Sequence, residues 1–403
     1  MENTTLAAGI NRTLKNVASK LPRPLRPKKD EIEFVSNGVL TLGVEIELQL
    51  IDPQTCNLAQ RAEELLKASS HLKNVKPELH LSTVEINTDI CANVQDVERD
   101  LRATMDGLDI ITDQLGIELA ATAVHPIAKY SDSIIFPNER YLDLIDRNQW
   151  LTRRLNIFGV HVHIGMRSGD ESIYFNNFFI NFLPHLLALS ASSPFWQGAD
   201  TGLSSCRATA YEALPTAGQP YPVRNWKDFE NLYETLKKCG SIKQLKDLWW
   251  DLRPSPGYGT LELRISDGCS TLYETLAIVA FIHSLAHWFA DHGSWYEFGH
   301  YPPVWILREN KWRAMRHGLD AELVMNIDGK TRPMREDIRE WVEKLKPYAK
   351  KLGYQEYLAD LLMLVERGPS ADRQRAVFKQ TGKLEDVVKL NVREYRNRKP
   401  EWA

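Results

Sequence analysis

Cysteine is scarce in this 403-residue sequence, and no two cysteines are spaced as Cys-x-x-Cys. The five thiols are odd in number and scattered along the chain, at Cys56, Cys91, Cys206, Cys239 and Cys269. This arrangement excludes a small disulfide-stapled fold and a zinc site built from cysteine pairs. It is typical of free thiols in a reducing compartment, so we expect a cytoplasmic protein.

Long apolar runs and a strong charge of one sign are missing as well. No stretch reaches the roughly 18 uninterrupted apolar residues of a membrane span, and we read no secretory signal at the N-terminus. The chain has 50 lysines and arginines against 53 acidic residues, a formal net charge of −3. We therefore expect neither a membrane span nor a nucleic-acid partner.

Two standard nucleotide-binding motifs are also absent. Asp328-Gly329-Lys330-Thr331 resembles the end of a P-loop, but Val324 stands where the first glycine of that motif is required. Gly257-Tyr258-Gly259 resembles the start of a dinucleotide fingerprint, but Glu262 replaces the third glycine and a strand follows instead of a helix. Any nucleotide site must therefore be of another kind.

Residues 1–33 differ in composition from the rest and form a basic leader. Two interpretations stay open: a poorly ordered segment, or a short amphipathic helix that docks on a partner or an anionic surface. The helix would run through Leu6, Ile10, Leu14 and Val17. We expect residues 34–370 to form the domain that carries the chemistry, and residues 371–403 to be a C-terminal helical segment packed on the same domain.

The remaining sequence alternates between strand-like and helix-like patterns. Apolar periodicity predicts strands over 41–51, 79–86, 117–124, 157–165 and 259–266, and helices over 94–115, 171–190 and 272–289. Beyond residue 309 the pattern is mainly helical. This order is not a regular βαβ repeat, so the fold class that we expect is α+β with a mostly antiparallel sheet.

Charged side chains inside the predicted strands are the most informative feature. Residues two apart in a strand share one face, which places Glu45 beside Glu47 and Glu262 beside Arg264. His161 and His163 share a face in the same way, and Glu78 and Glu85 lie in the segment 77–88.

A sheet face that carries several carboxylates and imidazoles suits a hard divalent cation together with phosphate oxygens. The alternative is a sheet with one solvated face. His283 and His287 lie four apart on an apolar helix without an adjacent carboxylate, so we expect packing histidines there.

Several segments, taken together and in order, resemble the carboxylate–amine ligase family, the type 2 glutamate–cysteine ligases of bacteria. The resemblance extends from about Leu42 to about Glu366 and includes the branch with weak glutamate–cysteine ligase activity. The segments are Thr41–Glu47, Val84–Thr88, Thr122–Pro126, Asn138–Tyr141, Phe158–Gly165, Ser204–Arg207, Asp251–Pro256 and Glu262–Arg264.

The resemblance implies a glutamine-synthetase-like fold, in which a curved, mostly antiparallel sheet flanked by helices forms an active-site funnel. It also implies ATP and two or more Mg²⁺ ions, with Mn²⁺ as a substitute. The implied reaction joins the γ-carboxyl of glutamate to cysteine through an acyl phosphate, giving γ-glutamylcysteine, ADP and phosphate, as in glutathione biosynthesis.

The resemblance also implies roles for individual residues. Arg264 and His163 would act on the transferred phosphoryl group, and Arg253 would contact the nucleotide with Arg264 or brace Asp251. Which of the two histidines binds metal stays open. The implied metal ligands are Glu45, Glu47, Glu78, Glu85, His161 and Glu262, and the implied substrate contacts are Arg207, Arg140 and His125.

Other functions stay open at this point. The same fold could serve a different acid and amine, a phosphotransferase, or a nucleotide-binding protein without catalysis. Ile46 and Leu48 depart from the residues that often stand beside the paired glutamates in the family, which leaves substrate specificity open. The partners that we expect are small amino acids, with a homo-oligomer as a further expectation.

Overall fold

The computed structural model describes residues 32–293 and 302–402. Contacts divide the chain into two compact units, Met1–Glu33 and Phe34–Ala403, and the architecture below is that of the second. The predicted leader helix at residues 6–17 lies outside the described residues.

The centre of the second unit is an eight-stranded sheet in which every pairing is antiparallel. Its main path has the strand order β11-β12-β6-β1-β4-β3, and two short strands pair with the C-terminal half of β1. The bounds are β1 Leu42–Asp52, β2 Asn57–Leu58, β3 Val75–Pro77, β4 Thr83–Asn87, β5 Glu118–Ala120, β6 Val160–Gly165, β11 Leu252–Ser255 and β12 Thr260–Leu263. The expected α+β class with a mostly antiparallel sheet is confirmed.

Strand β1 separates the core from the polar face. Leu42, Val44, Ile46 and Leu48 are buried on one side, whereas Glu45 and Glu47 alternate with them and stay partly accessible. Alternation of this kind follows from the two-residue period of a strand. The apolar face therefore faces the hydrophobic core, and the opposite face is left for polar side chains.

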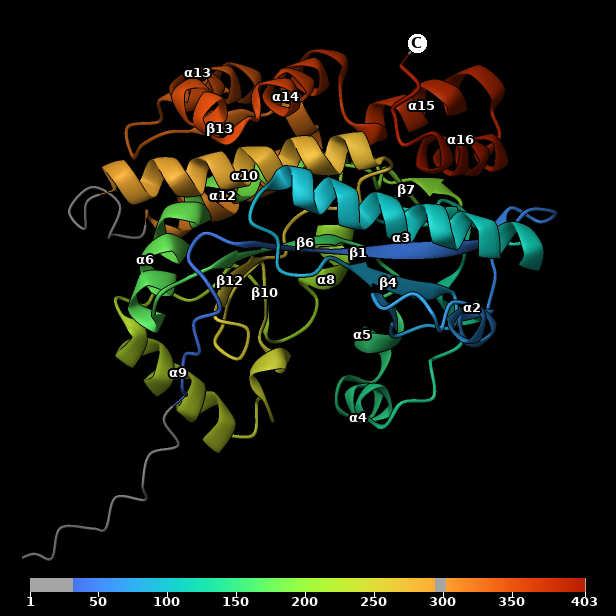
Figure 1. The fold of residues 1–403 in the computed structure, drawn as a ribbon, viewed down its shortest axis with the longest axis horizontal. Coiled ribbons are helices and arrows are strands. Elements are labelled where there is room, and N and C mark those ends of the chain that lie inside the picture. Colours follow the sequence, from blue (N-terminus) through green and yellow to red (C-terminus); the bar gives the residue numbers. More distant parts are fainter. Residues whose placement is uncertain (1–31, 294–301, 403) are drawn as a thin grey trace, which may run out of the picture. The chain divides into compact units, whose positions relative to one another are not determined.

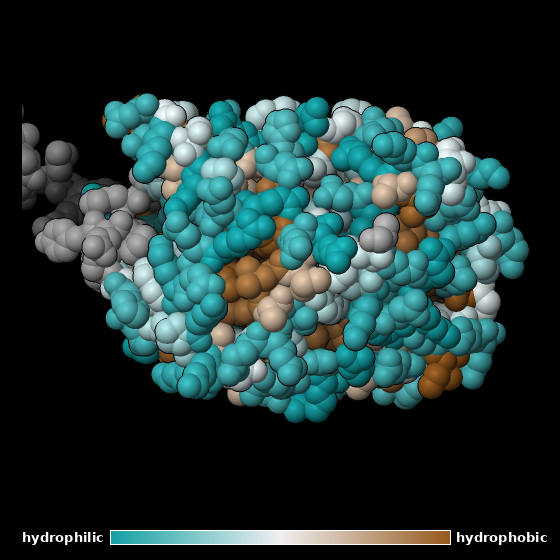
Figure 2. Space-filling view, turned by 90° about the horizontal axis from the view of Figure 1, so that it is seen from above, coloured by the Kyte–Doolittle hydropathy of each residue, from teal (hydrophilic) through white to brown (hydrophobic). Residues whose placement is uncertain are grey.

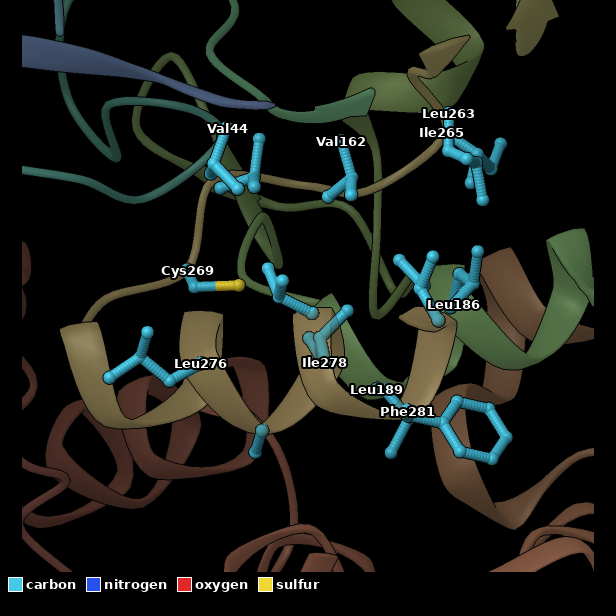
Figure 3. Close-up of a cluster of buried hydrophobic side chains, with 14 of the residues drawn as sticks. Val44, Val162, Leu186, Leu189, Leu263, Ile265, Cys269, Leu276, Ile278 and Phe281 are labelled. Atoms are coloured by element: carbon cyan, nitrogen blue, oxygen red, sulfur yellow. The ribbon is translucent and has the colours of Figure 1, made fainter. Parts of the chain in front are cut away.

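Two long helices cover the apolar face (Figure 1). They are α3 (Val94–Leu115) and α10 (Leu272–His292). Figure 3 shows Val44 and Val162 from the sheet facing Ile278 on α10, with Phe281 one turn further along the helix. This side of the sheet is thus a dry, close-packed core.

The predicted helix over 94–115 is confirmed to the residue, because both of its ends carry strong signals. The Asn93 side chain accepts a hydrogen bond from the Asp96 backbone N–H at the N-terminus. Gly116 ends the helix in the left-handed conformation, at φ 63°, which glycine adopts without steric cost.

The predicted helix over 171–190 is interrupted. Helix α6 (Gly169–Phe179) gives way to a 3₁₀ turn, η2 (Ile180–Phe182), before α7 (Leu183–Ser190). Pro184 stands in the first turn of α7, where its missing N–H and its ring break the hydrogen-bond ladder of a continuous helix. The two short helices keep their apolar faces on the same core.

Other helices form an outer layer beyond α10, and others lie on the side of the sheet opposite α3 and α10 (Figure 1). Residues Glu322–Val324 and Thr331–Pro333 pair as a small hairpin, β13–β14, inside the region predicted to be mainly helical. The other helices are α2 Ala62–Ala68, α4 Glu139–Asn148, α5 Trp150–Arg153, α8 Arg207–Tyr211, α9 Trp226–Lys238, α12 Val304–His317, α13 Met334–Leu352, α14 Gln355–Arg367, α15 Ser370–Thr381 and α16 Leu384–Asn397.

The C-terminal helices share the core of the unit. Tyr395 of α16 belongs to the same buried cluster as β1, and Val388 packs with Ile51 and Ala120. The face that the outer helices present in Figure 2 is mainly hydrophilic, with smaller apolar patches between polar side chains.

Helix α10 is the one described helix that is long and apolar enough to cross a membrane, and 83% of its most apolar window is buried inside the protein. His283 lies within it and accepts a hydrogen bond at Nδ1 from the Tyr354 hydroxyl, 2.8 Å away. Its Nε2 donates to the Leu40 carbonyl over 2.7 Å. His283 is therefore a buried, hydrogen-bonded packing histidine, as expected.

Candidate active site

Strand register gathers the predicted site residues on one face of the sheet. Glu47 pairs directly with Glu85 of β4, and Glu45 pairs with His161 of β6. His163 pairs with Glu262 of β12, which in turn pairs with Arg253 of β11. Side chains that are direct cross-strand partners point to the same side.

These side chains line a cavity of about 330 Å³ on the polar side of the sheet. All of the predicted site residues except His125 line it: Glu45, Glu47, Glu78, Glu85, Arg140, His161, His163, Arg207, Arg253, Glu262 and Arg264. The sheet is the floor of this cavity, and α4, α5 and α8 lie on the same side (Figure 1).

Three carboxylates in the cavity form a compact group. Glu47, Glu78 and Glu85 each offer an oxygen, and these oxygens lie within 4.8 Å of one another. Burial, reinforced by neighbouring carboxylates, raises the pKa of Glu47 and of Glu78 to about 7 and that of Glu85 to about 8. The group thus concentrates negative charge that lacks sufficient positive charge beside it.

A second group consists of Glu45, His161 and Glu262, whose ligand atoms also lie within 4.8 Å of one another. Burial alone would raise the pKa of Glu45, but hydrogen bonds from His161 and His163 outweigh it and hold that pKa well below its usual range. His161 Nδ1 lies 3.2 Å from a Glu45 oxygen. This second group is electrostatically balanced within the protein.

Two arginines clamp Glu262. Arg253 donates from Nε and Nη2 to one carboxylate oxygen, over 3.0 and 2.7 Å, and Arg264 Nη1 donates to the other. Burial opposes ionisation, but the two guanidinium groups outweigh it, so the pKa of Glu262 lies well below its usual range. Glu262 is therefore ionised and held rigidly.

The alternative that Arg253 braces Asp251 is wrong. Asp251 is paired instead with Lys311 of α12, whose Nζ lies 2.5 Å from its carboxylate and 2.5 Å from that of Glu212. Arg253 is fully engaged with Glu262 and with the carbonyls of Lys246 and Leu248.

The two histidines have different surroundings. His161 belongs to the second carboxylate group, whereas His163 Nδ1 bonds to the Thr260 hydroxyl over 2.8 Å. His163 Nε2 lies 3.5 Å from Glu45 and 3.9 Å from Glu262, so it borders the group without sharing it closely. The geometry favours His161 as the metal ligand of the pair.

The family profile described as glutamate–cysteine ligase family 2 matches residues 41–390. The chain belongs to glutamate–cysteine ligase family 2. The resemblance found in the sequence motifs is thereby confirmed.

Two bacterial relatives carry the provisional name glutamate–cysteine ligase 2. The protein of Bdellovibrio bacteriovorus is 46% identical over 362 residues, which cover 90% of this chain and 96% of the relative. That of Thermobifida fusca is 42% identical over 374 residues, covering 91% of this chain and 93% of the relative. Membership of the family makes this protein a ligase-type enzyme.

Solved structures share the fold at low sequence identity. The glutamate–cysteine ligase of Francisella tularensis, in complex with AMP, matches with a TM-score of 0.65 and 13% identity over 89% of both chains. A bifunctional glutathione synthetase of Pasteurella multocida matches with a TM-score of 0.61 and 15% identity, covering 89% of this chain and 52% of its own. These likenesses concern the fold alone.

Within this family fold, Arg207 is buried, with 4% of its surface exposed. Its guanidinium lies directly against Gly159, where an added Cβ would stand 2.4 Å from Nη2. The Nη groups reach the carbonyls of Arg264 and Ile265 over 3.3 to 3.4 Å. Arg207 is therefore a buried side chain held by backbone carbonyls and not a surface residue.

The structure does not bring His125 to the cavity. The ring is 2% exposed, and its Nδ1 accepts hydrogen bonds from the backbone N–H groups of Ile127 and Ala128 over 3.2 and 2.9 Å. Burial lowers the pKa of His125 to about 3, so the ring is neutral. Its role here is to hold the loop after β5. The expectation that His125 contacts a substrate is therefore wrong.

Arg140 lies in the first turn of α4, which the Asn138 side chain caps by accepting a hydrogen bond from the Arg140 backbone N–H. Asn138 is therefore the N-cap of α4. The strand predicted over 79–86 begins only at Thr83, as β4, and Glu78 lies in the segment between β3 and β4.

Several residues that line the cavity were missed by sequence reasoning. They lie in short strands, turns and helix ends, where no periodic pattern marks them: Lys76, Tyr141, Tyr211, Lys246, Trp249 and Tyr258. Tyr211 accepts a hydrogen bond from Arg264 Nε over 3.4 Å and packs against Trp249. Only tertiary contact brings these side chains to the site.

A second cavity of about 250 Å³ adjoins the first at the N-terminal end of β1. The two share Glu45, Lys76, His163 and Tyr258. The second is lined further by the start of β1 and by the turn Asn87–Ile90. Together the two cavities form a site that extends along β1.

Proposed function

We propose that this protein is an ATP-dependent ligase that joins a carboxylate to an amine through an acyl phosphate. Glutamate, by its γ-carboxyl, and cysteine are the first pair to test, with γ-glutamylcysteine, ADP and phosphate as products. The observation that carries the proposal is the group of Glu47, Glu78 and Glu85 beside Arg264, on the sheet face of a family member.

The residues fit a divalent cation. Glu47, Glu78 and Glu85 supply hard oxygen donors, and their raised pKa values mark negative charge that a cation would neutralise. Glu45, His161 and Glu262 form a second donor set. Bound Mg²⁺ would offset the charge of the nucleotide phosphates.

The protein's own cations would act on the phosphoryl group. Arg264, fixed by Glu262 and Tyr211, presents a permanent positive charge to the cavity. A substrate carboxylate oxygen would bond to the terminal phosphorus of ATP as ADP leaves. The amine nitrogen would then bond to the acyl carbon as phosphate leaves, with the amine proton passing to solvent.

The two cavities suggest an order along β1. The second cavity, with Tyr258 at its border, would hold the nucleoside, and the phosphates would extend over Glu45 toward Glu47. The AMP complex of the Francisella relative supports nucleotide use by this fold.

Cytoplasmic location, a homo-oligomer and docking by residues 1–33 stay predictions.

Product analysis tests the proposal. Purified protein is incubated with ATP, Mg²⁺, glutamate and a panel of amines, and phosphate release and product mass are measured. We expect phosphate release that requires both substrates, with the mass of an amide. The double variant Glu45→Gln/Glu262→Gln should abolish it, and Glu118→Gln, at an exposed position on β5, should not.

The alternatives have distinct signatures in the same assay. A stable phosphorylated product without an amide would favour a phosphotransferase. Nucleotide binding without turnover for any acid and amine would favour a non-catalytic protein. Turnover that survives in the double variant would show that the site is assigned to the wrong residues.

A further inference from the structure

The turn between β11 and β12 places an accessible aromatic ring at the boundary of the two cavities. Tyr258, in this turn, lines both cavities, and 54% of its surface is exposed. Its ring meets that of His163 edge-on, with the ring centroids 5.9 Å apart. Lys246, which lines the main cavity but not the second, lies over the Tyr258 ring with Nζ 6.0 Å from the centroid. An exposed ring beside a cavity offers a surface on which a flat ligand can stack.

The two cavities differ in positive charge. Among the described residues that line the second cavity, Lys76 is the one lysine or arginine, and neutral polar side chains such as Asn37, Thr41 and Thr88 stand beside it. The main cavity is lined by four arginines and by Lys246 as well as by Lys76. Phosphate groups bind preferentially where arginines and lysines gather. The phosphates of a nucleotide therefore suit the main cavity, and the uncharged nucleoside suits the second.

A surface strap, residues 34–40, holds the turn that carries Tyr258. The Val35 backbone N–H donates a hydrogen bond to the Pro256 carbonyl over 3.1 Å. The side-chain amide of Asn37 donates to the Tyr258 carbonyl over 3.2 Å. Asn37 also lines the second cavity. The strap therefore fixes the backbone of the turn and forms part of the cavity wall.

Gly259 allows the strap to approach the turn closely. Its φ is 64°, and a Cβ added there would stand 2.1 Å from the Val35 carbonyl oxygen and 2.8 Å from the Asn37 backbone nitrogen. A Cβ added to Gly257, in the same turn, would meet no atom within 4 Å. Both backbone conformation and space thus require glycine at position 259 and leave position 257 free to change.

We propose that the ring of Tyr258 stacks on the base of the nucleotide substrate, and that Asn37 is a positioning residue that keeps this ring at the boundary of the cavities. The nucleoside then lies in the second cavity, and the phosphates extend past His163 toward the carboxylates. The assignment rests on nucleotide use in the proposed function and adds the residues that contact the nucleoside.

Equilibrium binding of ATP and of inorganic tripolyphosphate to the full-length protein, both with Mg²⁺, tests the proposal without turnover. Tripolyphosphate carries the phosphates but no base, so the unaltered protein should bind ATP about tenfold more tightly, or better. Tyr258→Ser should weaken ATP binding about tenfold and leave tripolyphosphate binding unchanged. Tyr258→Phe keeps the aromatic face and should bind both ligands as the unaltered protein does.

Two further variants test the strap. Asn37→Ala and Gly259→Ala should each weaken ATP binding about threefold or more, again without an effect on tripolyphosphate. Gly257→Ala is the matched control and should leave the binding of both ligands unchanged. A loss that is equal for ATP and tripolyphosphate would show a general effect on the fold and would overturn the positioning role.

Equal affinity of the unaltered protein for ATP and tripolyphosphate would overturn the proposal without any variant, and so would unchanged ATP binding in Tyr258→Ser. Phosphate release with glutamate and the amine panel separates this claim from the ligase. If ATP binds as expected but no acid and amine support phosphate release, the ligase fails and the base contact stands. If release occurs and Tyr258→Ser leaves the KM of ATP unchanged, the ligase stands and the base contact fails.

Discussion

At the scale of single residues, the three carboxylates Glu47, Glu78 and Glu85 make the metal-free protein sensitive to pH. Their pKa values are raised in the folded state, to about 7 or 8, so folding favours their protonated forms. The stability that they contribute is fully present below their unfolded pKa near 4.5 and is lost as pH rises through 7 to 8.

We therefore expect the melting temperature in EDTA to fall between pH 5 and pH 8, and Mg²⁺ to raise it more at pH 8 than at pH 5. Glu85→Gln should flatten the pH dependence in EDTA. Thermal melts across this pH range, with and without Mg²⁺, check the expectation. A melting temperature in EDTA that rises toward pH 8 would contradict it.

Gly159 is a second residue-scale test, because its lack of a side chain leaves room for Arg207. Gly159→Ala would push the guanidinium aside, at the flexible end of a long side chain. The role that the family resemblance implies for Arg207 is to hold a substrate carboxylate, so we expect the KM of that substrate to rise about tenfold, equivalent to about 1.4 kcal/mol, with the melting temperature nearly unchanged. An unchanged KM would show that Arg207 does not contact substrate.

At the scale of elements, Lys311 ties α12 to the segments that present the arginines. It is 2% exposed and pairs with Asp251, next to β11, and with Glu212, which caps α8. Removing one partner of a buried ion pair leaves an uncompensated charge and typically costs about 3–5 kcal/mol. The pair therefore fixes the position of the walls that carry Arg207 and Arg253.

We expect Lys311→Met to lower the free energy of unfolding by that amount, about 3–5 kcal/mol, in denaturant titrations. Lys346→Met, which removes an exposed pair with Glu343 on α13, should change it by less than about 1 kcal/mol. Adding Asp251→Asn to the Lys311→Met protein should restore part of the loss. Equal effects of the two lysine substitutions would contradict this account.

The sequence predicted elements well where periodicity and end signals agree. Helix α3 was predicted to the residue from its apolar periodicity, and in the structure Asn93 and Gly116 mark its ends. The break at Pro184 was missed, because the apolar pattern continues across it. The site face of β1 was predictable from Glu45 and Glu47, since a strand alternates with period two.

What the sequence could not supply is register and tertiary contact. The division of the carboxylates into two groups follows from the pairing of Glu47 with Glu85 and of Glu45 with His161, which no single segment encodes. Lys311 comes from a helix far along the chain, so no pattern near Asp251 predicts the pairing of these two residues. His125 was wrongly predicted to contact a substrate, because its buried ring accepts hydrogen bonds from its own loop and does not reach the cavity.

At the scale of the whole molecule, the sheet divides a dry core from a cavity in which negative charge is concentrated and only partly balanced. We expect this imbalance to make the binding of a polyphosphate there depend on a divalent cation. Family membership and the shared fold agree with such a site.

The most direct test is equilibrium binding of ATP with Mg²⁺ and with EDTA, in the unaltered protein and in Glu47→Gln/Glu85→Gln. The account predicts that ATP binding requires Mg²⁺ in the unaltered protein and that the Mg²⁺ dependence is largely lost in the variant. Equally tight ATP binding in EDTA, or a Mg²⁺ dependence that the variant retains in full, would contradict it.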